Sequence, residues 1–210
     1  MKKDYIHFSI ILDRSGSMCS IQDATIKGFD AFMEEQRAQK GTASASLTKF
    51  DDRIELDYAF KDIQEVPKLD LQPRGSTALL DAIGVTLKNL NEKIKAMPDD
   101  EKPEQIVVVI ITDGEENSSR EYTYEKIAKK ISKRTDKDNW KFVYLGANQD
   151  AIATGAKLNI SAANSMTFAA NATGTANTYA SFSRNVSAYR SVKNDASMAF
   201  DLADRDNATK

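Results

Sequence analysis

Apolar residues follow two patterns along this chain: short continuous runs, and segments in which they recur every three or four positions. The first pattern is typical of buried strands and the second of helices with one buried face. Three runs predict strands, at 5–12, 105–112 and 140–147. Four recurring segments predict helices, at 21–40, 77–97, 123–135 and 175–193. Strands that alternate with helices in this way predict a parallel sheet with helical crossovers.

The stretches "SASLTKF" and "RIELDYAF" flank Asp51 and Asp52 and predict a hairpin with those two residues in its turn. A short helix within 149–160 and a last strand near 165–170 complete the expected elements. The fold class is therefore α/β: a doubly wound, mostly parallel sheet with one antiparallel edge hairpin strand and helices on both faces. Residues 1–193 are expected to form this single domain, and residues 194–210 a frayed C-terminal tail.

Composition narrows the function classes. The chain has 210 residues, 41% of them hydrophobic, and a net charge of −2, which gives no general attraction to nucleic acid or to an anionic membrane. The only cysteine is Cys19, so no internal disulfide can form. The apolar run near the N-terminus is short, is broken by charged residues and His7, and no cleavage site follows it. We therefore expect a cytoplasmic protein.

Oxygen-bearing side chains gather where the predicted strands end. Asp13 ends the first strand and Asp113 ends the strand 105–112, while Ser15 and Ser17 lie in the loop after Asp13. Thr77 stands where a loop becomes a helix. Ligands of open α/β sheets bind at the carboxyl ends of strands, so these groups should share one rim. Oxygen ligands with few carboxylates suit Mg²⁺ or a similar hard ion.

At these positions the sequence resembles the von Willebrand factor type A domain with its metal-ion-dependent adhesion site (MIDAS). The stretches that carry the resemblance are "DRSGSM", "STALLDA" and "ITDGEEN". The family's motif is Asp-x-Ser-x-Ser, then a distant Thr and a distant Asp. The matching residues here are Asp13, Ser15, Ser17, Thr77 and Asp113.

The resemblance implies Mg²⁺ or Mn²⁺ bound mainly through Ser15, Ser17 and Thr77, with Asp13 and Asp113 acting directly or through water. It also implies that a Glu or Asp of a protein partner completes the coordination. The expected protein is then a metal-dependent protein-binding module rather than an enzyme. With no signal peptide or membrane anchor expected, it looks like the intracellular bacterial or phage-type members of the family.

Other interpretations of the same residues stay open at this point. The serines alone are compatible with capping of the following helix. Asp13 as a phosphoryl-accepting nucleophile would need a second Asp two residues on, where Ser15 stands, and serine hydrolysis would need a base near the rim. A structural or assembly subunit whose metal only stabilises the fold is a further alternative.

Three polar residues near the motif are predicted to have structural or solvent-exposed positions. Glu115 and Glu116 are interpreted as solvated loop charges and are not counted as ligands. Asp81, one helical turn after Thr77, is interpreted as a carboxylate favoured at the start of a helix.

Overall fold

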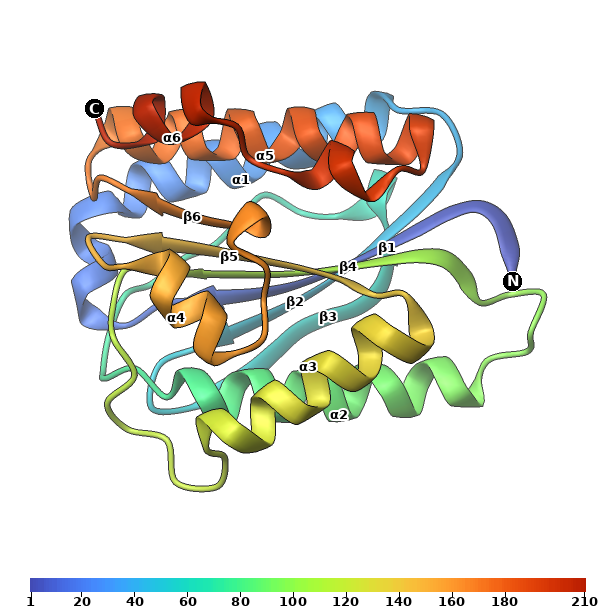
Figure 1. The fold of residues 1–210 in the computed structure, drawn as a ribbon, viewed down its shortest axis with the longest axis horizontal. Coiled ribbons are helices and arrows are strands. Elements are labelled where there is room, and N and C mark those ends of the chain that lie inside the picture. Colours follow the sequence, from blue (N-terminus) through green and yellow to red (C-terminus); the bar gives the residue numbers. More distant parts are fainter.

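A six-stranded sheet runs through the centre of the molecule, between two layers of helices, in a computed structural model that describes residues 1–210 (Figure 1). The strands are β1 (Lys2–Asp13), β2 (Thr42–Phe50), β3 (Ile54–Asp62), β4 (Pro103–Thr112), β5 (Lys141–Ala147) and β6 (Ser165–Phe168). Their order is β3-β2-β1-β4-β5-β6, and only the β2–β3 pair is antiparallel. The predicted α/β fold with an antiparallel edge hairpin is confirmed.

Helices cover both faces of the sheet. They are α1 (Gln22–Ala38), α2 (Leu79–Ala96), α3 (Tyr124–Asp138), α4 (Ala151–Lys157), α5 (Ala172–Val192) and α6 (Leu202–Ala208). Figure 1 shows α1, α5 and α6 on one face and α2 and α3 on the other. The helix predicted from residue 21 begins at Gln22, because residues Gly16–Ile21 form a 3₁₀ turn. No helix is both long enough and apolar enough to cross a membrane.

The uninterrupted apolar run of β4 is explained by its two buried faces. Val107, Val109 and Ile111 belong to the core beneath α1 and α5. Ile106, Val108 and Ile110 belong to the core beneath α2 and α3. A strand in the middle of a parallel sheet needs apolar residues at every position for this reason.

The C-terminal residues 194–210 differ from the frayed tail that we expected. Residues Asp195–Met198 form a 3₁₀ turn, and α6 follows with a capping box between Asp201 and Asp204. Met198 and Phe200 are buried in the core on the α5 side. Two apolar side chains and a seven-residue helix make too weak a sequence pattern to predict this packing. Their burial depends on contacts with α5, which only the folded domain provides.

The single histidine lies inside the sheet, far from the strand ends. The Nδ1 atom of His7 is 2.8 Å from Ser44 Oγ and its Nε2 atom is 3.2 Å from Ser46 Oγ. The ring of Phe60 stacks on the imidazole, with 3.8 Å between the ring centroids. Burial lowers the pKa of His7 from 6.5 to about 3, so the folded protein holds a neutral imidazole at pH 7.

This buried imidazole should make stability depend on pH. Below about pH 6.5 the unfolded chain binds a proton at His7, whereas the folded protein binds it only near pH 3. The free energy of unfolding therefore falls as the pH falls, by about 2 kcal/mol at pH 5 relative to pH 7 from this residue. Urea denaturation of the wild type and His7→Gln at both pH values isolates the effect. The same pH dependence in both proteins would contradict it.

Candidate metal centre

Asp13 lies at the rim where the central strands end. Strands β1 and β4 are parallel neighbours with Leu12 opposite Ile111, so Asp13 and Thr112 are adjacent at the carboxyl end of the sheet. The Asp13 carboxylate is fully buried. Its Oδ1 atom accepts the backbone N–H of Ser15 at 2.6 Å, and its Oδ2 atom accepts the hydroxyl of Thr112, also at 2.6 Å. The strand therefore ends on a carboxylate that is held from both sides.

The two serines connect this carboxylate to the second one. The hydroxyl oxygens of Ser15 and Ser17 are 3.1 Å apart. Ser17 Oγ donates a hydrogen bond to Asp113 Oδ1 at 2.6 Å. Four of the five predicted site residues, Asp13, Ser15, Ser17 and Asp113, are thus joined in one chain of hydrogen bonds.

The fifth predicted residue, Thr77, reaches the same place from the start of α2. A Cβ atom built on Gly114 would lie 3.0 Å from Thr77 Oγ1 and 3.6 Å from Ser17 Oγ. Glycine at this position therefore leaves open the space between the two hydroxyls, which a side chain would fill. Gly114 was not among the residues expected at the site, although it directly follows Asp113 in the sequence.

Burial shapes the charge of this cluster. Burial raises the pKa of Asp13 to about 6, against the opposing effect of its hydrogen bonds from Thr112 and Ser15, and the nearby charge of Asp113 raises it further. Burial also raises the pKa of Asp113. A bound cation favours the charged form of a nearby carboxylate and so opposes this effect of burial. Two buried carboxylates with raised pKa values therefore suit a divalent ion.

The donor set fits a hard cation. It holds two carboxylates and three hydroxyls, all oxygen donors of the kind that Mg²⁺ and Mn²⁺ prefer. No group of three or more His, Cys, Asp or Glu side chains suited to a metal occurs in the structure. Any ion at the rim would therefore depend on the hydroxyls of Ser15, Ser17 and Thr77 as well as on the carboxylates.

The loop after β4 holds Thr77 in place. Asn117 Oδ1 accepts the backbone N–H of Thr77 at 2.9 Å. The carbonyl of Thr77 in turn accepts the backbone N–H groups of Asn117 and Ser118, at 3.1 Å and 3.3 Å. This two-way contact couples the position of the Thr77 hydroxyl to the loop that carries Asp113.

Glu116 is not the solvated loop charge that we expected. Its carboxylate accepts hydrogen bonds from the backbone of Leu80, Ser118 and Ser119, and from the Ser119 hydroxyl. It therefore caps the first turn of α2, where helices leave backbone N–H groups without partners. Nothing in the local sequence shows this role, because α2 begins 37 residues earlier, at Leu79.

Asp81 lies in the first turn of α2, as expected, but its carboxylate binds the loop after β4. Its carboxylate accepts three backbone N–H groups, those of residues 120–122, at 2.7–3.0 Å. Together with Asn117 and Glu116, Asp81 ties residues 116–122 of the loop after β4 to Thr77 and the first turn of α2.

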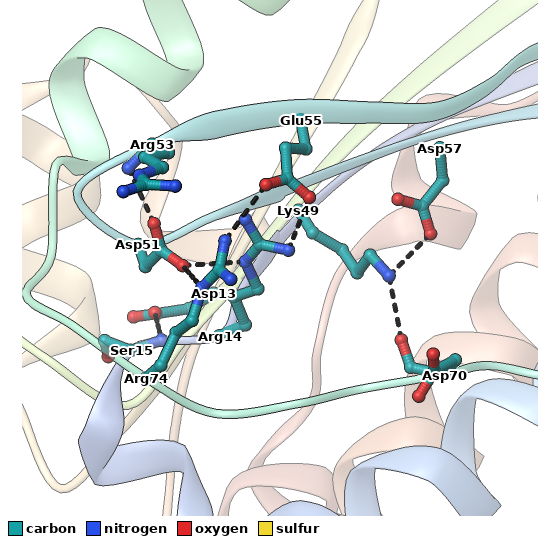
Figure 2. Close-up of polar contacts among 10 residues, drawn as sticks. All are labelled: Asp13, Arg14, Ser15, Lys49, Asp51, Arg53, Glu55, Asp57, Asp70 and Arg74. Atoms are coloured by element: carbon teal, nitrogen blue, oxygen red, sulfur yellow. Dashed lines mark hydrogen bonds and ion pairs between the residues drawn. The ribbon is translucent and has the colours of Figure 1, made fainter.

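A network of ion pairs between side chains supports the cluster on the side of the β2–β3 turn (Figure 2). Arg14, between Asp13 and Ser15, donates to Asp51 Oδ2 at 2.9 Å and to Glu55 at 2.7 Å. Arg74 donates to the same two carboxylates, at 2.8 Å and 3.0 Å. Although burial opposes it, hydrogen bonds from Arg74 and the Arg53 backbone hold the pKa of Asp51 below its usual value. The β2–β3 turn is thus bound to the loop that carries Ser15 and Ser17.

Comparison with known proteins identifies the fold. No family model matches the sequence, and no curated protein matches it. A von Willebrand factor type A protein from Catenulispora acidiphila has a similar structure, with a TM-score of 0.57 and 16% identity over 89% of this chain and 42% of that one. This chain has the von Willebrand factor type A fold.

Two further structures with this fold carry metals. Proximal thread matrix protein 1 of the mussel byssus, with a zinc-occupied MIDAS motif, has a TM-score of 0.54 and 19% identity over 78% of this chain and 41% of that one. The manganese-loaded TRAP protein of Plasmodium vivax has a TM-score of 0.50 and 17% identity over 70% of this chain and 58% of that one. The present chain spans less than half the length of the mussel and Catenulispora proteins.

Proposed function

We propose that this protein is a metal-dependent protein-binding module and not an enzyme. A divalent ion, Mg²⁺ or Mn²⁺, would be held by Ser15, Ser17 and Thr77, with Asp13 and Asp113 as direct or water-mediated ligands. The observation that carries the proposal is the chain of hydrogen bonds from Asp13 to Asp113 through two serines. The metal-containing MIDAS of a protein with the same fold supports it.

The exposure of the five residues indicates where a partner would bind. Asp13, Ser15 and Thr77 are buried, whereas Asp113 is partly exposed and Ser17 is exposed. The open side of the cluster is therefore the side of Ser17 and Asp113. When bound, a divalent ion would be balanced by two carboxylates and would supply a coordination position for an acidic side chain of the partner.

The position of the only histidine supports a binding role. His7 lies six residues before Asp13 on β1, about 20 Å along the strand, and its ring is enclosed by Ser44, Ser46 and Phe60. No imidazole base therefore stands near Ser15 or Ser17, as a serine nucleophile of the usual type requires. Asp13 has both carboxylate oxygens engaged by hydrogen bonds.

The test is capture of partners with and without metal. Ser17→Ala removes an exposed ligand and should leave the fold intact, while weakening Mg²⁺ binding at least about tenfold. Proteins captured by the wild type in Mg²⁺, and identified by mass spectrometry, should be lost in EDTA and with Ser17→Ala. Cys19→Ala, at an exposed position of the same turn, serves as the matched control and should bind normally. A partner retained in EDTA would contradict the mechanism.

A structural role for the metal is the second candidate. It is favoured by the complete burial of Asp13, because a cation there would relieve the unfavourable burial of a charged carboxylate. If the metal serves only the fold, Mg²⁺ should raise the melting temperature strongly, and the captured proteins should be the same with and without it.

A further inference from the structure

A cavity of about 460 Å³ lies on the opposite side of α2 from the loop contacts described above, between that helix and the edge hairpin. Its floor is the surface of β1 and β2, and its walls are residues of α2 and β3. Because β3 is the last strand of the sheet, the surface between α2 and this edge is left open. The cavity volume falls in the range typical of sites for small molecules.

The floor of this cavity is polar where a sheet beneath a helix is normally apolar. Ser9, Ser46 and Thr48 line it, and Thr86 faces them from α2. Ser46 is hydrogen bonded to His7 and to the backbone of Phe60. The hydroxyls of Ser9 and Thr86 have no hydrogen-bond partner, although the two residues are only 1% and 6% exposed.

Two such hydroxyls in one cavity are unfavourable for the fold alone. Buried polar groups are nearly always paired, and exceptions in native proteins need an explanation. Local departures of this kind are expected at functional sites. A ligand with a hydrogen-bonding group at the floor would satisfy both Ser9 and Thr86.

The β3 wall of the cavity is apolar and partly rigid. Leu56 is 52% exposed, one of few large apolar residues with such exposure, and Leu90 lines the opposite wall from α2. The ring of Phe60 is fixed by stacking on His7, and its backbone N–H donates to Ser46 Oγ at 3.0 Å. The fixed ring of Phe60 therefore provides a surface on which a ligand ring of comparable size can pack.

The only charge at the cavity is positive. Lys93 is the only charged residue among those that line it, and it forms no salt bridge. No carboxylate lines the cavity. An anion would therefore be attracted to the exposed ammonium group without competition from a neighbouring acid.

We propose that this cavity binds a small aromatic carboxylate that also carries a hydrogen-bonding substituent. The carboxylate pairs with Lys93, the ring lies between Phe60 and Leu90, and the substituent reaches Ser9 and Thr86. A peptide strand added to β3 is less favoured, because the β2–β3 pairing shifts register twice and because β3 exposes charged residues. The site is independent of the proposed metal centre.

The binding test uses the full chain and 3-(4-hydroxyphenyl)propanoate as the probe, titrated in calorimetry and by NMR in EDTA. We expect saturable binding with a Kd on the order of 0.1–1 mM, and shifted signals for Leu56, Thr86 and Leu90. The neutral amide of the same acid should bind about tenfold more weakly. Absence of saturable binding in EDTA, or equal affinity for acid and amide, would overturn the proposal without bearing on the metal centre.

Variants separate the parts of the site. Lys93→Gln should abolish the preference for acid over amide, whereas Lys88→Gln, on an exposed part of the same helix, should keep it. Ala59→Trp should block the cavity from the exposed hairpin and remove binding. Thr86→Val should remain folded and lose the preference for the hydroxylated probe over 3-phenylpropanoate. Unchanged affinity in Ala59→Trp, or shifts confined to the outer edge of β3, would overturn the proposal.

Discussion

Replacing Asp51 with alanine is expected to lower the free energy of unfolding by about 3–5 kcal/mol, because it breaks a buried ion pair and leaves one partner charged. The Asp51 side chain is fully buried, and Arg14 beside it is only 6% exposed. Arg74 loses the same partner but is 49% exposed, so water can replace that contact. The loss therefore comes mainly from Arg14, whose remaining carboxylate partner is the half-exposed Glu55.

Urea denaturation followed by fluorescence of Trp140, the only tryptophan and a buried one, measures this loss. Asp52→Ala, at the exposed neighbouring position of the same turn, is the matched control and should change stability by no more than about 0.5 kcal/mol. Because Arg14 stands between Asp13 and Ser15, Asp51→Ala should also weaken Mg²⁺ binding in the protein that remains folded. Equal stability of the Asp51 and Asp52 variants would show that the network is not important for the fold.

Replacing Asp13 with asparagine is expected to stabilise the metal-free protein at pH 7 and to abolish its response to Mg²⁺. Burial raises the pKa of Asp13 from 3.8 to about 6, so its charged form makes the folded state less favourable by up to about 3 kcal/mol at pH 7. Asparagine has the same shape without the charge. Its oxygen can accept the Ser15 N–H, and its amide can donate to Thr112 Oγ1, whose own hydrogen can then go to the Gly114 carbonyl at 3.1 Å.

Thermal unfolding with EDTA and with Mg²⁺ tests this prediction. The wild type should melt below Asp13→Asn in EDTA and gain stability with Mg²⁺, whereas the variant should gain nothing. A carboxylate with a raised pKa loses its destabilising effect as it is protonated, so the difference in EDTA should shrink as the pH falls from 7 to 4. Asp113→Asn, at the partly exposed carboxylate, should lose the Mg²⁺ response with a smaller gain in EDTA. An Asp13 variant that is still stabilised by Mg²⁺ would contradict the assignment of this residue.

The strands and helices could be predicted from the sequence, whereas the contacts around the site could not. Strands, helices and the hairpin follow from periodic patterns that any chain segment carries in itself, and β4 was recognised because both of its faces are apolar. The tail 194–210 was missed because its pattern is short, and its burial depends on α5. The helix-capping role of Glu116 and the loop contacts of Asp81 were missed for a similar reason, since these partners lie 36–41 residues away in the sequence.

The sequence by itself determined the α/β fold class and which residues bring oxygen atoms to one rim, because the strand ends and the alternation of strands with helices follow from local patterns. Only the tertiary structure decided how these residues meet. The hydrogen-bond chain from Asp13 to Asp113, the space that Gly114 leaves beside Thr77, and the pairing of Arg14 with Asp51 all join segments that are distant in the chain. The unpaired hydroxyls of Ser9 and Thr86 are likewise visible only there, because packing decides which polar groups find a partner.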